Sequence, residues 1–337
     1  MTTPSRRLQM ADIARLAGVS TSTVSRALSH SPLVNQETRD RILDLARSLN
    51  YTINIGAQNL RLQQNRTVAV VIPIDQSSRQ QLSDPFFLSM LGSLADALSE
   101  QGFDTLVSRV DADQVDAASA PFDGGRAIGV ILIGQGRHHD QLNKMAARGV
   151  PFVVWGAQLP QQLYTTVGGD NVTGGRLATE RLLAQGRRRI AFLGDTTLPE
   201  VEQRYRGYVE ALAAHGLAPD PQLQVAVSFL PESGGQAVAE LARRGVDYDA
   251  MFASSDLLAM KAIHAMRAQG RDVPADVAVV GYDDIELSGY FHPPLTTIGQ
   301  PRDVAARALV DALLVLVDGR TAPSVQLPTD LIARASA

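Results

Sequence analysis

Two hydrophobic patterns divide this chain near residue 66. In the first fifty residues, apolar side chains recur at three- and four-residue spacing, which is typical of short amphipathic helices. Gly18 separates the first two such segments, Ser20 is placed to cap the second, and Asn35 is placed to cap a third. The apolar positions are Ile13, Ala14, Ala17, Val24, Leu28, Ile42, Leu45, Ala46 and Leu49. Two short helices joined by a turn that contains glycine form the helix-turn-helix pattern of DNA-binding modules.

From Thr67 onward, short β-branched runs alternate with amphipathic helical stretches. The runs are VAVVIPI (68–74), AIGVILIG (127–134), VPFVVWG (150–156), RIAFLG (189–194), AMFAS (250–254) and VAVVGYDD (277–284). The helical stretches lie roughly at 86–101, 139–148, 173–186, 203–216, 233–244 and 256–270. Nearly continuous apolar strands that alternate with helices indicate parallel sheets covered on both faces. The region is longer than one sheet usually holds, so the pattern predicts an α/β core of two lobes with a cleft between them.

A polar segment, YTINIGAQNLRLQQNR at 51–66, joins the two patterns. It has too few large apolar side chains to fold alone, so we interpret it as a linker that becomes ordered on binding. The chain therefore divides into a helix-turn-helix DNA-binding domain at 1–50, a hinge at 51–66 and a core at 67–337.

The distribution of charge supports this division. The chain has a net charge of −4, but residues 1–61 contain eight arginines against four acidic residues. A basic head on an acidic body is expected where only the head meets phosphate. No run approaches the ~20 apolar residues of a membrane span, the N-terminus has no apolar signal segment, and cysteine is absent. We expect a cytoplasmic protein without disulfides or Cys-based zinc sites.

A series of motifs, taken in order, resembles the LacI/GalR family of bacterial transcriptional regulators. The motifs are DIARLAGVSTSTVSRALS, ETRDRILDLARSLNY, DPFF (84–87), GGDNVTGG (168–175), RYRGYVEAL (204–212), SSDLLAM (254–260), VAVVGYDDIEL (277–287) and PPLTTIGQP (293–301). The resemblance extends from about Met10 to Ile332. It implies an α/β protein with an N-terminal all-α helix-turn-helix headpiece, followed by two Rossmann-like lobes of the periplasmic-binding-protein type.

The same resemblance implies how the lobes share the chain. Crossings are expected near 163–166, 294–297 and 323–326. The first lobe would then hold about 67–164 and 297–323, and the second about 165–294 and 326–337. Family members act as dimers, and several form tetramers through a C-terminal leucine heptad. This chain ends in LIARASA, so we expect a homodimer.

By resemblance, the second helix of the headpiece reads the DNA bases. Thr21, Ser22 and Arg26 occupy positions at which family members touch base edges. The guanidinium of Arg26 can donate two hydrogen bonds to guanine O6 and N7, although outside this motif it would be an ordinary solvated arginine. The side chains expected to cap this helix or to bind phosphates are Ser20, Thr23 and Ser25. The expected partner is double-stranded, pseudo-palindromic operator DNA.

The hinge carries a second set of expected DNA contacts. Leu60 occupies the position at which family members wedge a leucine into the minor groove, with Asn54 and Ala57 as further contacts. The alternative is that Leu60 packs against the core. Ile53 stands where many members have proline, and Gly56 costs up to about 1 kcal/mol of helix propensity. We therefore expect a hinge that orders less readily than the average for the family.

The effector is expected to bind between the lobes. By resemblance, the candidate contacts are Phe86, Phe87, Asp170, Arg204, Ser255 and Asp283. Trp155, the only tryptophan, ends a predicted strand on the cleft side and is a further candidate. A forked guanidinium and a carboxylate in one cleft can bind neighbouring hydroxyls of a polyol. The aromatic residues could instead be ordinary core residues, and Asp256 is expected to cap its helix rather than touch ligand. A sugar or sugar derivative is the favoured effector, with a nucleoside or purine as the alternative.

The predicted function is that of a ligand-gated, operator-binding regulator, most often a repressor, although an activator is possible. A solute-binding protein without a DNA role would need export and would not need a basic head. An enzyme is disfavoured because the chain has no HExxH motif, no G-x-S-x-G elbow and no phosphate-binding glycine loop. No metal and no cofactor are expected.

Overall fold

The computed structural model describes residues 10–28, 31–49, 65–74, 82–230 and 232–337. Its contacts divide the chain into two units, a headpiece that ends at Asn65 and a core that begins at Arg66. Each unit has hydrophobic clusters of its own.

The headpiece consists of α1 (Met10–Ala17), α2 (Thr21–Leu28) and α3 (Gln36–Ser48). Gly18, at φ +65°, permits the turn between α1 and α2. Ser20 Oγ accepts a 3.1 Å hydrogen bond from the backbone N–H of Thr23, and Asn35 caps α3 through the N–H of Thr38 at 2.8 Å. The shared core is formed by Ile13, Ala14, Ala17, Val24, Ala27, Val34 and Ile42. The helix-turn-helix pattern and both predicted caps are present.

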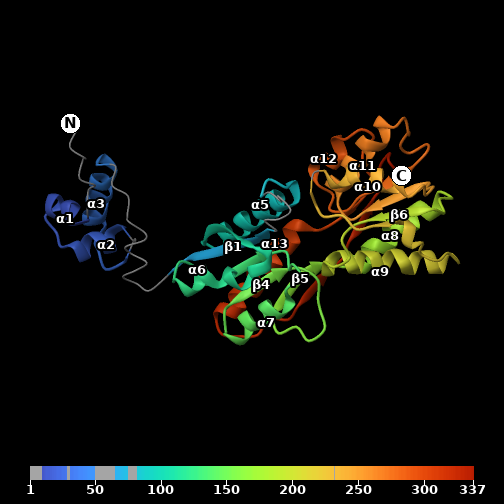
Figure 1. The fold of residues 1–337 in the computed structure, drawn as a ribbon. Coiled ribbons are helices and arrows are strands. Elements are labelled where there is room, and N and C mark those ends of the chain that lie inside the picture. The colour runs from blue at the N-terminus through green and yellow to red at the C-terminus, as the bar shows by residue number, and fades with distance from the viewer. Residues whose placement is uncertain (1–9, 29–30, 50–64, 75–81, 231) are drawn as a thin grey trace, which may run out of the picture. The chain divides into compact units, whose positions relative to one another are not determined.

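The first lobe of the core is a six-stranded parallel sheet in the order β11-β5-β4-β3-β1-β2. Its strands are β1 (Thr67–Ile74), β2 (Asp104–Asp111), β3 (Val130–Ile133), β4 (Phe152–Trp155), β5 (Thr165–Gly169) and β11 (Val325–Leu327). The helices α5 (Pro85–Glu100) and α13 (Arg302–Val317) pack on one face. The other face is covered by η1 (Ala112–Ser119), α6 (Ala120–Asp123) and α7 (His139–Ala147). Figure 1 shows α5, α7 and α13 around the strands β1, β4 and β5 of this lobe. Both faces of the central strands are therefore buried, as their continuous apolar runs predict.

The second lobe is a four-stranded parallel sheet in the order β7-β6-β8-β9. Its strands are β6 (Ile190–Leu193), β7 (Gln224–Val225), β8 (Ala250–Ala253) and β9 (Ala278–Val280). The helices α8 (Asn171–Ala184) and α9 (Pro199–Ala214) pack on one face. The helices α10 (Ser233–Arg243) and α11 (Asp256–Ala268) pack on the other. The lobe also contains two short elements, η2 (Pro221–Leu223) and α12 (Glu286–Tyr290).

Three passages of the chain join the lobes. The chain leaves the first sheet after β5, returns between β10 (Thr297–Gly299) and α13, and crosses again between β11 and β12 (Asp330–Ile332). β10 and β12 form an antiparallel pair. β5 and β11 pair within the first sheet up to Gly169 and Leu327, so the first and third passages follow these residues.

The predicted α/β class with two parallel-sheet lobes is confirmed. Several elements lie outside the segments predicted from the sequence, among them the short strands β5, β7, β10, β11 and β12. β2 is a half-exposed edge strand without an apolar run, and α13 has a clear helical pattern that lies beyond the last predicted helix. None of the described helices has the length and apolar character needed to cross a membrane.

Candidate functional site

The second helix of the headpiece presents its polar side chains to solvent. Thr21, Ser22 and Arg26 are exposed, whereas Val24 and Ala27 on the same helix are buried in the headpiece core. Ser20 Oγ lies 2.7 Å from Ser22 Oγ and 2.8 Å from Thr23 Oγ1. Thr23 and Ser25 are partly buried. The fold thus leaves the predicted base-reading side chains free to face a partner.

The predicted hinge contacts Asn54, Ala57 and Leu60 lie outside the described residues, as do Ile53 and Gly56.

A cavity of about 180 Å³ in the core is lined by both lobes. The lining comes from the ends of β1, β3 and β4 and the start of α5 in the first lobe. In the second lobe it comes from the start of α9 and the segments that follow β6, β7, β8 and β9. Ligands of open parallel sheets bind beyond the carboxyl ends of the strands, so this is the expected place for a site. The predicted contacts that line the cavity are Phe86, Phe87, Trp155, Arg204, Ser255 and Asp283.

The aromatic residues of the cavity also serve as packing residues. Trp155, the only tryptophan in the chain, ends β4 and is 6% exposed. Its ring lies 6.4 Å from that of Phe86, which in turn lies 6.0 Å from that of Phe87. Phe86 packs against hydrophobic clusters of both lobes. These residues therefore line the cavity and also pack as core aromatics, and their contact with a ligand stays a prediction.

Arg204 is buried on α9 and is held by neutral partners. Its Nε donates to Asn171 Oδ1 at 2.9 Å and its Nη1 donates to the carbonyl of Ser254 at 2.6 Å. The guanidinium lies over the ring of Tyr282 at 3.7 Å from the ring centre. Among the described residues, no carboxylate lies within ion-pair distance of Arg204. Arg204 and Asp283 both line the cavity without forming a direct ion pair with each other.

Asp283 is a buried carboxyl with an unusual backbone. Its φ of +111° lies in the left-handed region, which a residue with a Cβ rarely adopts. Gln300 Nε2 donates to its Oδ1 at 2.8 Å, and Arg302 Nη1 donates to its carbonyl at 2.7 Å. Burial raises the pKa of Asp283 to about 7, although the nearby Arg204 opposes this shift.

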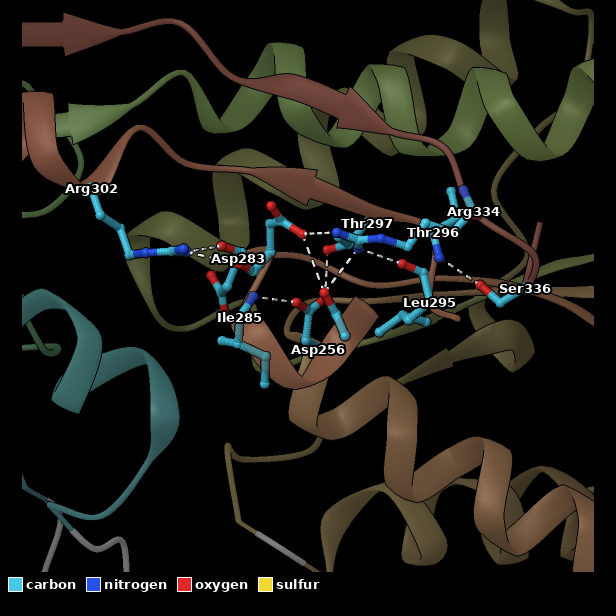
Figure 2. A network of polar contacts seen from close by, with 11 residues as sticks. Asp256, Asp283, Ile285, Leu295, Thr296, Thr297, Arg302, Arg334 and Ser336 are labelled. Atoms are coloured by element: carbon cyan, nitrogen blue, oxygen red, sulfur yellow. Dashed lines mark hydrogen bonds and ion pairs between the residues drawn. The ribbon is translucent and has the colours of Figure 1, made fainter. Parts of the chain in front are cut away.

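The cap of α11 differs from the prediction. Ser255, not Asp256, is the N-cap, and its Oγ accepts from the N–H of Leu258 at 3.3 Å. Asp256 is fully buried, and its carboxyl accepts from the hydroxyl of Thr297 and, at 2.9 Å, from the N–H of Ile285 (Figure 2). Burial and then the charge of Asp283 raise the pKa of Asp256 well above its ordinary value. The side chain of Asp256 therefore fixes the start of α11 to β10 and the loop after β9.

Asp170 is not brought to the cavity. Its carboxylate caps α8 by accepting from the N–H of Thr173 at 3.0 Å, and the residue is not part of the lining. The helix starts directly after β5, so Asp170 is used at the helix terminus rather than in the cleft.

Several residues of the cavity were not predicted. They are Asp84, Gln135, Arg137, Asp195, Glu200 and Phe229. Asp84 belongs to the DPFF motif and caps α5, and Glu200 precedes Arg204 by one helical turn, so these two had a signal in the sequence. Gln135, Arg137 and Asp195 follow strands of different lobes, and no local pattern marks them. Within the described ranges, no group of three or more histidine or acidic residues is arranged to hold a metal ion.

Two family models match this chain. Residues 9–54 match the bacterial regulatory proteins of the lacI family, and residues 179–337 match the periplasmic binding protein-like domain.

Curated relatives match nearly the whole chain. The HTH-type transcriptional regulator CelR of Thermobifida fusca is 35% identical, with 98% of each chain covered. The HTH-type transcriptional repressor CytR of Escherichia coli K12 is 31% identical, with 92% of this chain and 89% of the relative covered.

Solved structures agree with the sequence matches. A CelR–cellobiose complex superposes with a TM-score of 0.72 at 32% identity and covers 98% of this chain and 100% of its own. A Lac repressor dimer bound to operator and the anti-inducer ONPF gives a TM-score of 0.86 at 26% identity, over 98% and 99% of the two chains. This family consists of transcriptional regulators rather than enzymes. On these grounds the chain belongs to the LacI family and is a DNA-binding transcriptional regulator with a periplasmic-binding-protein-like core.

Proposed function

We propose that this chain is a homodimeric repressor whose affinity for operator DNA changes when a sugar or sugar derivative occupies the cavity between the lobes. The observation that carries the proposal is the cavity itself, where Arg204 and Asp283 face a space bounded by Trp155 and Phe86. A guanidinium donates and a carboxylate accepts, so together they suit the hydroxyl pairs of a polyol. An aromatic wall suits the apolar face of a sugar ring.

The relatives point in the same direction. The CelR structure contains cellobiose, and another relative, 29% identical, is the ribose operon repressor of Haemophilus influenzae. The aromatic walls would also accept a purine or nucleoside base, which stays as the alternative effector class.

The DNA side of the proposal rests on α2 and the hinge. Arg26, Thr21 and Ser22 would contact base edges, Ser20, Thr23 and Ser25 would bind phosphates, and Leu60 with Asn54 and Ala57 would enter the minor groove. Because two identical headpieces bind two half-sites, the operator should be pseudo-palindromic.

The dimer would form through an apolar surface beside a groove that both lobes line. Leu88 on α5 is 52% exposed, and Leu287 and Tyr290 on α12 are 53% and 80% exposed. Large apolar side chains gathered on a monomer surface mark interaction sites. Tyr290→Asp should therefore shift the chain from dimer to monomer in light scattering, and a variant that stays dimeric would contradict this assignment.

The experiment that tests the function begins with selection of bound DNA from a random pool at fixed salt. We expect an enriched pseudo-palindrome of roughly 14–20 base pairs with a flexible central step. The selected operator is then titrated with the protein in the presence of neutral mono- and disaccharides and, separately, nucleosides.

A change in operator affinity with a saccharide supports the proposal. A change with nucleosides alone would show that the effector is a nucleoside rather than a sugar. An enriched site without two-fold symmetry would contradict the homodimer. The selected sequence placed at a promoter distinguishes repression from activation by the sign of its effect on transcription.

A further inference from the structure

The charged residues that line the cavity can be divided into two sets. We call Arg137, His138, Asp113 and Asp195 the outer set, and Asp84, Glu200, Arg204 and Asp283 the inner set. In the outer set, Arg137 donates to Asp195 and to Thr197 Oγ1 at 2.7 Å, and His138 Nε2 lies 3.1 Å from Asp113 Oδ1. Asp195 therefore has an ion-pair partner, and Asp113 a hydrogen-bond partner, within the lining itself.

The inner set has three carboxyl groups and one guanidinium. Asp84, Glu200 and Asp283 line the cavity beside Arg204. Arg204 is tied to neutral oxygens of Asn171 and Ser254, so it does not neutralise any one of these carboxyls by a direct pair. Within the described part of the chain, the inner cavity is thus formally acidic.

The pKa shifts reflect the burial of these carboxyls and, for Asp283, the neighbouring charge of Asp84. Burial raises the pKa of each of Asp84, Glu200 and Asp283. Arg204 lowers the pKa of Glu200 and Asp283, but for both groups burial is the larger effect. The charge of Asp84 further raises the pKa of Asp283, so the carboxyls of the two lobes act on each other across the cavity.

The wall of the cavity also contains a buried hydrogen-bond acceptor that has no donor among the described residues. Gln135 is 1% exposed and lines the cavity; its Nε2 donates to Tyr164 Oη at 2.5 Å. Its Oε1 is buried and has no hydrogen-bond partner among the described residues. A hydroxyl group can donate to such an atom, whereas ionised phosphate and carboxylate groups only accept.

We propose that the cavity accepts saccharides that carry no phosphate or carboxylate group, and that Glu200 is the residue that excludes the anionic ones. The inference rests on the proposed function and narrows its ligand class. An arginine alone would attract phosphate and carboxylate, since its planar fork matches both. Glu200, one turn before Arg204 on α9, adds a like charge against such ligands while it can still accept from sugar hydroxyls.

Trp155 makes the charge of the cavity measurable without a ligand. It is the only tryptophan, so quenching of its fluorescence reports on the cavity alone. The quenching constants of caesium and iodide, each divided by that for free N-acetyltryptophanamide, are compared at constant ionic strength and at a pH above the pKa of Asp283, and acrylamide corrects for limited access. We expect caesium to quench about threefold more strongly than iodide in the wild type. Glu200→Gln should lower this ratio at least twofold. The matched control is Glu202→Gln, which removes the same charge from the same helix turn at a position outside the cavity lining and should not change the ratio.

Matched sugars test the selection itself. Cellobiose and cellobiose 6′-phosphate, which keeps both sugar rings and adds an anionic group, are titrated against Trp155 fluorescence in the full-length wild type and both variants. We expect cellobiose to bind at least tenfold more tightly than its phosphate, and Glu200→Gln to reduce this preference severalfold. Equal binding of the two sugars, or iodide quenching as strong as caesium quenching in the wild type, would overturn the proposal.

Failure of the proposed sugar effector can be distinguished from failure of the role proposed for Glu200. If operator binding responds to no saccharide, the sugar assignment is wrong, yet the ratio of caesium to iodide quenching still decides whether Glu200 makes the cavity repel anions.

Discussion

Asp283 combines backbone strain, burial and a position between the lobes. A residue with a Cβ at φ +111° costs on the order of 1–3 kcal/mol, and Asp284 follows at φ +50°. The hydrogen bonds that hold Asp283 come from Gln300 and Arg302, which lie where the chain returns to the first lobe. A ligand that contacts the Asp283 carboxyl would therefore be connected, through Gln300 and Arg302, to the segment in which the chain returns to the first lobe.

Asp283→Asn should change how the stability of the core depends on pH. The pKa of Asp283 is about 7 in the folded chain against an ordinary value of 3.8, so the folded chain retains a proton between about pH 4 and pH 7 that the unfolded chain has released. The free energy of unfolding of the wild type therefore falls as pH rises through this window, and the loss persists above it. The amide of the variant cannot ionise, and its oxygen can still accept from Gln300.

We expect the variant to gain stability relative to the wild type by up to about 4 kcal/mol between about pH 4 and about pH 8. Urea unfolding at both pH values measures this difference. Asp247→Asn, at an exposed position, is the control. A difference that does not vary with pH would show that Asp283 is ionised throughout.

Arg26→Ala should weaken binding to the selected operator by about 1–3 kcal/mol, because a bidentate contact with guanine would be lost. The loss should be accompanied by relaxed preference at one base position in each half-site. Arg47→Ala removes the same charge from an exposed site on α3 and should reduce specific and non-specific binding alike. Fluorescence anisotropy on operator and scrambled DNA measures both, and equal losses for the two variants would exclude base reading by Arg26.

At the scale of elements, the packing of α8 on α9 sets the position of Arg204. A Cβ added to Gly175 on α8 would lie 2.0 Å from the carbonyl oxygen of Arg204, and one added to Gly207 on α9 would lie 2.0 Å from that of Val172. Only glycine permits two helices to approach so closely. Asn171, at the start of α8, then reaches the guanidinium.

Gly175→Ala should therefore lower the free energy of unfolding by roughly 2–3 kcal/mol, since the two helices must separate. It should also weaken effector binding, because Arg204 moves with α9. Gly235→Ala on α10 is the matched control: its nearest neighbour would be Ala265 Cβ at 3.9 Å, an ordinary contact. That change should stabilise the core by about 0.5–1 kcal/mol through helix propensity. Thermal and urea unfolding measure whether each variant loses or gains stability. A Gly175→Ala variant as stable as the wild type would contradict the close approach of the two helices.

At the scale of the whole core, few side chains of the described residues connect the lobes apart from the three passages of chain. Arg137 after β3 contacts Asp195 and Thr197 after β6. Gln203 on α9 donates to the carbonyl of Gln158 at 3.2 Å. Hydrogen bonds of this kind are worth little singly, so a bound ligand can shift the equilibrium between lobe positions.

Arg137→Ala should weaken effector binding about two- to fivefold while leaving the unfolding of each lobe nearly unchanged, because the lost ion pair joins the lobes at their surface. Trp155 fluorescence titrations of wild type, Arg137→Ala, Asp195→Asn and the double variant form a double-mutant cycle. Additive effects would show that the two residues act independently rather than as a link between the lobes.

The local pattern of the sequence determined most of the longer helices and the strands with continuous apolar runs. The headpiece caps Ser20 and Asn35 and the central strands β1, β3 and β4 were predictable, because hydrogen-bonding side chains at helix starts and continuous apolar runs act over a few residues. β2 was not, since an edge strand with one exposed face carries no apolar run. The resemblance to the LacI family, which depends on the order of motifs, supplied the two-lobed core.

The sequence by itself also determined the basic headpiece, the exposed Arg26 and the residue types needed for a polyol site. Only the tertiary structure decided which of these residues share a cavity. Asp170 and Asp283 both follow strands, yet Asp170 caps α8 while Asp283 lines the cavity beside Arg204. Glu200, Gln135 and Arg137 join them from segments of different lobes. The physical reason is that helix caps and strand runs depend on near neighbours in the chain, whereas burial, pKa and cavity walls depend on residues that folding brings together from distant positions.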